Sequence, residues 1–258
     1  MSITADSLPI EVTLRGNVGD FAGDYARDKI AAALEVTHEP VLRGHVVLDF
    51  SHDPGLERQA LAAVTVDVNG TTIRAKTSAR TMNEAVDDLE YRLRRQLVQL
   101  KDRSRTRHRW TGIAEQSEWR RGDLPRRPLP YFPRAEDTRE VVRHKSFASV
   151  PMTVDEAAFE MDLLDHDFFL YLDTESGKPA LVHRLPPGGY GVQGAAPTTA
   201  VATVTYEAEP SAMTDDEART RLEADGEPFV FYLNCETGEG RVLYHRFDGH
   251  YGLITLAT

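Results

Sequence analysis

The C-terminal half of the chain contains one sequence unit twice, with an offset of 61 residues between the copies. When residues 152–192 are aligned with residues 213–253, no gap is needed and 13 of 41 positions are identical. A unit of about 50 residues rarely buries enough apolar surface to fold alone. We therefore expect the two copies to pack on each other within one chain.

The composition is that of a globular protein, and 258 residues are enough for two or more domains. The N-terminus lacks the basic start and apolar core of a signal peptide, and no stretch approaches the roughly 18 apolar residues of a membrane span. Cys235 is the only cysteine, so no internal disulfide can form. These features favour a cytoplasmic protein, and Cys235 is expected to be a buried, unreactive thiol.

The formal net charge of −11 hides a strong polarity along the chain. Residues 135–258 carry nine Lys and Arg against 22 Asp and Glu, a net charge of −13. Residues 91–110 carry eight Lys and Arg against Asp102 alone, a net charge of +7, and five further arginines precede residue 135. A local basic stripe is the usual signature of phosphate binding. The alternative is a basic helix end that is merely solvated.

The N-terminal part alternates between patterns typical of strands and of helices. Asn69-Gly70, between two apolar runs, predicts a hairpin turn, and Thr81 with Glu84 predicts a capping box at the start of the last helix. The predicted elements, in β-α-β-β-β-α order, are Ile10–Arg15, Phe21–Val36, Val41–Phe50, Ala60–Val68, Thr71–Thr77 and Met82–Arg103.

The last of these helices has two distinct faces. One is an apolar stripe with spacings of three and four residues: Val86, Leu89, Leu93, Leu97 and Leu100. The other, about 100–160° away, is polar and largely basic: Arg92, Arg95, Gln99 and Arg103. We expect the first face to pack on the sheet and the second to present guanidinium groups to phosphates.

Residues 111–136 form a Pro- and Arg-rich linker, whose X-Pro pairs favour a stiff, extended backbone. The two repeats follow at residues 137–193 and 200–258, and each is expected to contain a helix that opens with a Thr-x-x-Glu capping box. The predicted strands, in the first and second copy, are Val141–Phe147 and Ala200–Glu207, Phe168–Leu172 and Phe229–Leu233, and Ala180–Arg184 and Arg241–Arg246.

The middle strands of the repeats are too rich in aromatic residues to face water. We expect them to form the interface between the copies, through Phe168, Leu170, Tyr171, Phe229, Phe231 and Tyr232. The predicted fold is therefore α+β. A βαβββα domain, similar to double-stranded-RNA-binding domains, occupies residues 1–110, and two small tandem α+β repeats that pack on each other follow it.

The sequence contains no recognisable catalytic, cofactor or metal site. None of the nine histidines has the spacing of metal ligands on one helix face, and there is no phosphate-binding glycine loop. We expect neither an enzyme nor a bound cofactor. His183-Arg184 recurs as His245-Arg246, one residue out of the 61-residue register, which indicates a structural or interface role.

Several segments resemble the long-form ribosome hibernation promoting factors, also described as the ribosome-associated inhibitor or sigma-54 modulation protein family. In the first domain the similar residues are Tyr25, Lys29, Gly70 to Ala75, Val86-Asp87, Arg92-Leu93, Arg95-Gln96-Leu97 and Lys101-Asp102-Arg103. The second repeat is closer, through Ala212-Met213-Thr214, Phe229-Val230-Phe231, Glu236-Thr237-Gly238 and residues 242–254. Two C-terminal copies resemble an actinobacterial variant linked to hypoxia or dormancy.

The resemblance implies that the first domain occupies the mRNA and tRNA channel of the small ribosomal subunit. It also implies a C-terminal domain that pairs with a second copy on another ribosome, but this chain already holds two such domains. The predicted RNA-binding residues are Arg27, Lys29, Arg74, Lys76, Arg80, Arg92, Arg95, Gln99, Lys101, Arg103, Arg105, Arg107 and Arg109.

Our leading hypothesis is a non-enzymatic stress-response protein that silences translation in dormant cells. Its expected partners are the small subunit, with its 16S rRNA and ribosomal proteins, and the 70S ribosome, with no membrane or DNA partner. We expect a monomer that holds single 70S ribosomes without joining them into 100S dimers. The alternative is a protein-interaction module that uses the acidic repeats, with the basic helix only solvated.

Overall fold

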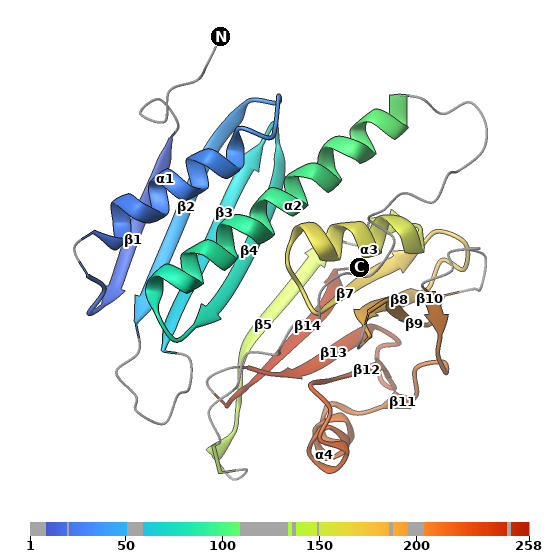
Figure 1. Cartoon of the computed structure of the whole chain (residues 1–258). Coiled ribbons are helices and arrows are strands. Elements are labelled where there is room, and N and C mark those ends of the chain that lie inside the picture. Colours follow the sequence, from blue (N-terminus) through green and yellow to red (C-terminus); the bar gives the residue numbers. More distant parts are fainter. Residues whose placement is uncertain are drawn as a thin grey trace. The chain divides into compact units, whose positions relative to one another are not determined.

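The computed structural model describes residues 9–19, 21–50, 59–108, 134–135, 138–148, 150–185, 188–195, 204–246 and 249–257. The prediction of a stiff linker falls on residues 111–136, nearly all of which lie outside this described part. An N-terminal domain and a pair of C-terminal repeats are each described by themselves (Figure 1).

The N-terminal domain confirms the predicted order of elements. These are β1 (Ile10–Gly16), α1 (Ala22–Leu34), β2 (Val41–Phe50), β3 (Ala60–Val68), β4 (Thr71–Ala79) and α2 (Met82–His108). The sheet has the order β1-β2-β3-β4, with β1 parallel to β2 and the other pairs antiparallel. Both helices cover one face of this sheet (Figure 1).

Local sequence explains most of this domain. Asn69 and Gly70 both have positive φ, 50° and 86°, as the tight turn between β3 and β4 requires. Every second residue of β3, from Ala60 to Val68, is buried. Thr81 and Glu84 exchange the two capping-box hydrogen bonds at 3.2 and 3.3 Å. The apolar stripe of α2 is buried, with Leu89 and Leu93 at 0% exposure, so it anchors the helix on the sheet.

Each C-terminal repeat contributes one helix and five strands or short strand segments, in the same order in both copies. The first contributes β5 (Val141–Ala148), β6 (Pro151–Met152), α3 (Val154–Leu163), β7 (Phe168–Asp173), β8 (Pro179–Arg184) and β9 (Tyr190–Gln193). The second contributes β10 (Val204–Tyr206), β11 (Ala212–Met213), α4 (Asp215–Asp225), β12 (Phe229–Asn234), β13 (Gly240–His245) and β14 (Tyr251–Ala257). Strands β6, β9, β11 and β14 were not predicted from the sequence.

The leading strands are exchanged between the repeats. The two five-stranded sheets have the orders β10-β9-β8-β7-β6 and β11-β12-β13-β14-β5. Strand β5, expected within the first repeat, pairs in parallel with β14 of the second, and β10 pairs in parallel with β9 of the first. Each sheet therefore depends on a strand from the other copy, and neither repeat is complete alone.

The paired repeats have three apolar clusters. One lies between α3 and its sheet and contains Met161 and Tyr171, and an equivalent one lies between α4 and its sheet and contains Leu222 and Tyr232. The third is built from both sheets: Leu170, Leu181, Phe231, Val242 and Leu256, with Phe168, Phe229 and Ile254 packed against it. We call this third set the shared cluster. It makes the two repeats one packed body.

The Tyr-Gly pair near the end of each repeat has a steric explanation. A Cβ atom at Gly191 would lie 2.2 Å from Nε2 of His183, and one at Gly252 would lie 2.3 Å from the Tyr244 ring. The missing side chain makes room for a ring from the neighbouring strand. His183 and Tyr244 occupy equivalent positions, so His183 and His245 are not equivalent. His183 contacts Glu207 and the Phe229 ring of the second repeat, which agrees with the expected structural or interface role.

Cys235 is exposed, which corrects the expectation of a buried thiol. It follows β12 in a turn that is organised by its neighbour Asn234. The Asn234 side-chain oxygen accepts hydrogen bonds from the backbone N–H groups of Glu236 and Thr237, both at 3.0 Å. The buried side chain of this turn is therefore Asn234, and Cys235 points away from the core.

Candidate nucleic-acid interface

The charge of α2 divides at its middle. The first three turns carry the acidic residues Glu84, Asp87, Asp88 and Glu90. The remainder of the helix carries the basic residues Arg92, Arg94, Arg95, Lys101, Arg103, Arg105 and Arg107, with Asp102 as the only acidic residue. A phosphate-binding surface on this helix would therefore be confined to its C-terminal half.

A polar seam joins the acidic half of α2 to α1. The Tyr25 hydroxyl donates a hydrogen bond to Asp87 at 2.7 Å, and Nζ of Lys29 lies 2.8 Å from Asp87 and 3.7 Å from Glu90. The hydrogen bond with Lys29 lowers the pKa of the Asp87 carboxyl and raises the pKa of Lys29. Lys29 thus has a structural role between the helices, in addition to any role in binding RNA.

On the basic face of α2, Arg92 is hydrogen-bonded to the edge strand β4 of the sheet. Nη1 of Arg92 donates to the backbone oxygen of Lys76 at 2.8 Å, and Nε2 of Gln96 donates to that of Arg74 at 2.7 Å. A four-residue step along a helix, about 6 Å, matches a two-residue step along a strand. Two side chains of α2 therefore donate hydrogen bonds to carbonyl groups on alternate residues of β4, a role that was not predicted from the sequence.

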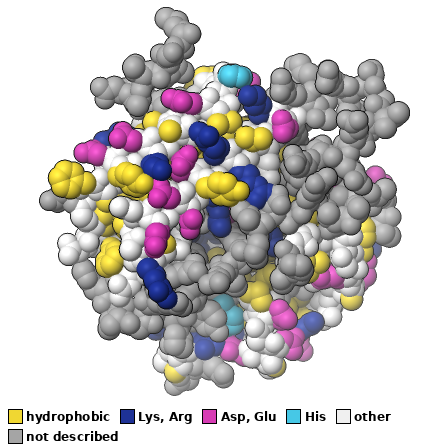
Figure 2. All heavy atoms as spheres, viewed as in Figure 1, with side chains coloured by type: hydrophobic (Ala, Val, Ile, Leu, Met, Phe, Trp, Pro, Cys, Tyr) yellow, Lys and Arg dark blue, Asp and Glu magenta, His cyan; other side chains and the backbone are white. Residues whose placement is uncertain are grey.

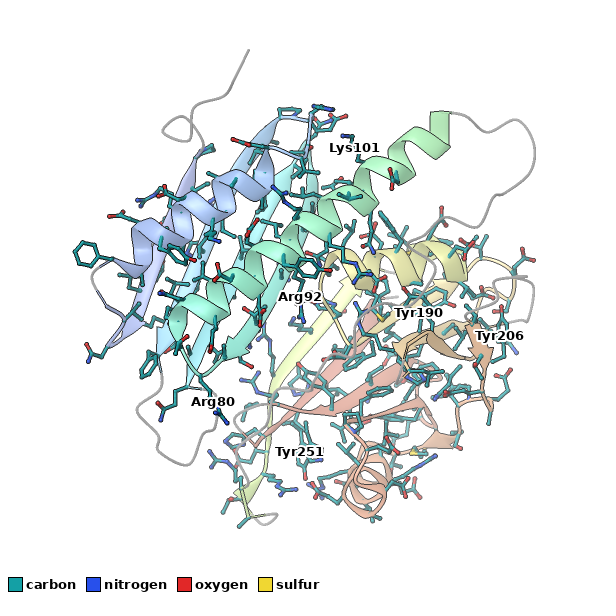
Figure 3. All side chains as sticks on the ribbon, in the orientation of Figure 1. Arg80, Arg92, Lys101, Tyr190, Tyr206 and Tyr251 are labelled. Carbon is teal, nitrogen blue, oxygen red and sulfur yellow. The ribbon has the colours of Figure 1, made fainter. Side chains whose placement is uncertain are left out.

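The structure places the other predicted RNA-binding residues in three groups. Arg27 on α1 pairs with Asp24 at 2.8 Å, and Arg74, Lys76 and Arg80 belong to β4 or follow it. Arg95, Gln99 and Lys101 lie on the C-terminal half of α2, where Nζ of Lys101 is 3.5 Å from the backbone oxygen of Val36. Figure 3 labels Arg80, Arg92 and Lys101 on this domain.

The remaining predicted residues lie at the end of α2 or beyond it. Arg103, Arg105 and Arg107 belong to the helix, which is one turn longer than predicted, although their side chains are outside the described part. Arg109 lies outside the described residues. All of these assignments to RNA binding stay predictions.

Sequence reasoning also missed an exposed aromatic residue on α2. Tyr91 is 58% exposed and Val98 is 41% exposed. Helical spacing places Tyr91 about 180° from the middle of the leucine stripe, so its exposure could have been predicted from the sequence. Figure 2 views the domain from the side of its helices and shows hydrophobic side chains among Lys, Arg, Asp and Glu.

The predicted repeat-pairing residues divide between two faces of their strands. The structure brings Phe168, Leu170, Phe229 and Phe231 to the shared cluster, where the Phe168 and Phe229 rings are 4.8 Å apart. Tyr171 and Tyr232 lie instead in the separate cores under α3 and α4, which corrects that part of the prediction. The reason is the two-residue period of a strand, which points neighbouring side chains to opposite faces.

No group of three or more His, Cys, Asp or Glu residues in the described part of the chain could hold a metal ion. None of the helices in the same part is long and apolar enough to cross a membrane.

Comparison with known proteins gives consistent matches for all three domains. Residues 10–105 match the family model "Sigma 54 modulation protein / S30EA ribosomal protein". Residues 136–192 and 199–253 each match the model of the C terminus of that same family. The family model for the C terminus therefore matches twice, in agreement with the duplication.

Curated relatives align over most of the chain. The ribosome hibernation promotion factor of Picosynechococcus is 30% identical over 190 residues, which cover 71% of this chain and 96% of that protein. The protein of the same name from Lactococcus lactis is also 30% identical, over 71% of this chain and 97% of its own length. The dormancy associated translation inhibitor of Mycobacterium tuberculosis is 29% identical, over 76% of this chain and 70% of its own length. On these matches, the chain belongs to the sigma-54 modulation and S30EA ribosomal protein family, with its C-terminal domain duplicated.

Proposed function

We propose that this protein is a ribosome hibernation factor that silences translation and protects idle 70S ribosomes in the cytoplasm. It binds the mRNA and tRNA channel of the small subunit through the C-terminal half of α2. The names of the relatives support the general function, because two ribosome hibernation promotion factors align along nearly their whole length. The observation that carries the proposal is the net charge of +7 over residues 91–110 in a chain whose net charge is −11.

The physical basis of binding is neutralisation of the RNA backbone. Arginine forks suit bidentate contacts with phosphate oxygens, and each neutralised phosphate releases counterions, so affinity falls steeply with salt. Within the predicted set, Arg95, Lys101 and Arg103 belong to the basic half of α2. Arg92 and Lys29 have structural contacts as well, so their substitution would disturb β4 or α1 and would not report on RNA binding alone.

Reversal of charge on α2 tests this proposal. The variant Arg95→Glu/Arg103→Glu should no longer co-sediment with ribosomes at moderate salt, whereas wild type should. The matched control is Arg219→Glu/Arg221→Glu, which changes the net charge equally on α4, where both arginines are about half exposed. Unimpaired pelleting of the α2 variant would contradict the proposal. Loss of binding in the α4 control alone would favour the alternative, a protein-interaction module that uses the acidic repeats.

We also propose that the repeats keep the protein monomeric and prevent the formation of 100S dimers. The shared cluster and the exchanged strands β5 and β10 already occupy, within one chain, the surface that a second copy would need. A covalent link gives the partner repeat an effective concentration of about millimolar, so intramolecular pairing prevails at ordinary protein concentrations.

Light scattering and sucrose gradients test the role of the repeats. The intact protein should be a monomer and should leave ribosomes as 70S particles. Deletion of residues 195–258 removes both β10 and β14, so β9 and β5 lose their neighbours and the truncated chain should self-associate. Abundant 100S particles with the intact protein would contradict this part of the proposal.

A further inference from the structure

The outward face of α2 carries an exposed ring beside guanidinium groups. Tyr91 is 58% exposed and Val98, seven residues further on, is 41% exposed on the same side of the helix. Arg94 and Arg95 follow Tyr91 by three and four residues, which places one on each side of the line from Tyr91 to Val98. We call these four residues the crest.

The contacts of the described residues do not account for the exposure of Tyr91. Among the described residues its hydroxyl makes no hydrogen bond and its ring makes no aromatic contact, whereas Tyr25, Tyr232 and Tyr251 all donate hydrogen bonds to carboxylates. Asp87 and Asp88 lie one turn before this ring and Arg94 and Arg95 lie one turn after it, so Tyr91 stands at the start of the basic half of α2. A large exposed ring at this position is available for contact with a binding partner.

One side of the crest is held in place. Nη2 of Arg94 donates to the backbone oxygen of Ala32 at 3.3 Å, and its Nε lies 3.7 Å from Glu90. A guanidinium group has five N–H donors, so Arg94 keeps donors available after these contacts. The cation is therefore fixed one turn from Tyr91 and can still reach an anionic group.

We propose that Tyr91 is a stacking platform for an unpaired nucleobase of the ribosomal RNA, with Arg94 and Arg95 on the adjoining phosphates. This inference rests on the proposed function and adds a specific contact to it. Charge complementarity selects RNA as the occupant, because residues 91–110 have a net charge of +7. Single-stranded RNA offers both a π face and phosphates at the spacing of one helical turn, and aromatic rings bind bases with little regard to sequence.

The test compares two substitutions of Tyr91 in the full chain by their affinity for 70S ribosomes at several salt concentrations. Tyr91→Leu keeps an apolar side chain but removes the ring, and should weaken binding about 5- to 150-fold. Tyr91→Phe keeps the ring and should bind within about twofold of wild type. Neither should change the slope of log K against log salt, because neither removes a phosphate contact.

The variant Arg95→Gln serves as the positive control for phosphate binding and should make the salt slope shallower by roughly 0.7–0.9. Full affinity of Tyr91→Leu beside a binding-competent wild type would overturn the stacking inference alone. Equal losses in Tyr91→Phe and Tyr91→Leu would assign the effect to the hydroxyl and would overturn it too. Failure of wild type to bind would instead remove the proposed function. Thermal unfolding checks that each variant is folded, as expected for an exposed position.

Discussion

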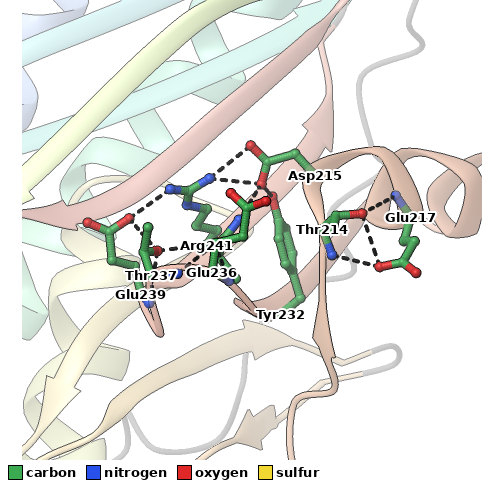
Figure 4. Close-up of polar contacts among 9 residues, drawn as sticks. Thr214, Asp215, Glu217, Tyr232, Glu236, Thr237, Glu239 and Arg241 are labelled. Carbon is green, nitrogen blue, oxygen red and sulfur yellow. Dashed lines mark hydrogen bonds and ion pairs between the residues drawn. The ribbon is translucent and has the colours of Figure 1, made fainter.

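At the position of Tyr232 in the second repeat, the first repeat has Tyr171, and the two hydroxyl groups have different surroundings. The Tyr232 hydroxyl donates to Asp215 at 2.6 Å, and Asp215 also accepts from Nη1 of Arg241 at 2.8 Å (Figure 4). The equivalents of Asp215 and Arg241 in the first repeat are Val154 and Ala180. The Tyr171 hydroxyl is buried and has no hydrogen-bond partner among the described residues.

The residues that follow the two helices have different side chains in the same backbone conformation. Both α3 and α4 are followed by a residue in the left-handed region, with φ of 53° at Asp165 and 65° at Gly226. Glycine adopts this conformation without strain, and aspartate is among the few other residues that tolerate it. The backbone geometry is thus the same in both copies, although the side chain differs.

The exchanged strands are also held by different polar groups. Glu223 of α4 accepts hydrogen bonds from Arg139, which precedes β5, and from Tyr251. On the sheet of the first repeat, Glu207, which directly follows β10, contacts His183 at 3.0 Å and accepts from Gln193 at 2.7 Å. The comparison teaches that the capping boxes, aromatic strands and ring-facing glycines define the fold, whereas the polar networks around them were free to diverge.

The prediction with the largest expected effect tests whether the two repeats unfold together. Leu181 and Val242 are equivalent residues of the shared cluster, both at 0% exposure. Leu181→Ala should reduce the free energy of unfolding by about 2–5 kcal/mol, and Val242→Ala by about 2 kcal/mol. Hydrogen exchange should speed up in both repeats whichever residue is replaced. Faster exchange confined to the substituted repeat would show that they are independent.

A smaller effect is expected when the second repeat is given the apolar pattern of the first. Asp215→Val removes the acceptor of the Tyr232 hydroxyl and one of the two carboxylates that pair with Arg241, the other being Glu239, and should cost about 1–3 kcal/mol in urea unfolding. Adding Arg241→Ala gives these two positions the residues of the first repeat and should recover part of this loss, because the guanidinium that has lost one of its two carboxylate partners is gone. Simple addition of two unfavourable effects would mean that the two side chains do not act as a pair.

Replacement of the two equivalent tyrosines by phenylalanine should change the stability of the protein in different directions. Tyr232→Phe removes a hydrogen bond to Asp215 and should destabilise the protein by about 1 kcal/mol. Tyr171→Phe removes a buried hydroxyl that has no partner in the described part and should be neutral or stabilising by up to about 1 kcal/mol. The thermal midpoints of the two variants, measured side by side, should therefore lie on opposite sides of wild type or differ clearly. Equal losses would disprove the difference in surroundings.

The smallest expected effect is a response to acid. Burial tends to raise the pKa of Asp215, but hydrogen bonds from Tyr232 and Arg241 outweigh it and hold the pKa below its ordinary value of 3.8. The contribution of the ionised carboxylate is thus present above about pH 4 and is lost as pH falls through the lower, folded-state pKa. Asp215→Asn should flatten the stability profile below pH 4, whereas Val154 gives the first repeat no such dependence. An unchanged profile would contradict this assignment.

Much of the local structure followed from the sequence, for reasons that are themselves local. The bounds of β2 and β3 agree with the prediction, because the apolar alternation and the Asn69-Gly70 turn define them. The capping box at Thr214 and Glu217 is present as expected. The apolar stripe of α2 also faces the sheet as predicted, since a 3.6-residue period fixes which side chains share a face.

Only part of the candidate RNA-binding face could be predicted from the sequence. Helical spacing placed Arg92 beside Arg95, but it could not reveal that Arg92 reaches the Lys76 carbonyl of β4. It likewise could not show that Lys29 pairs with Asp87. Such contacts join residues far apart in the chain, and the pattern within one helix does not contain them.

The sequence by itself determined that there are two copies, that each has a helix and an apolar strand, and that they pair. Only the tertiary structure decided that β5 joins the sheet of the second copy and β10 that of the first. The copies have similar edges, so a leading strand can pair in the same way with its own sheet or with the other. The packing of the shared cluster joins residues of both copies, and the pattern of one strand does not contain it.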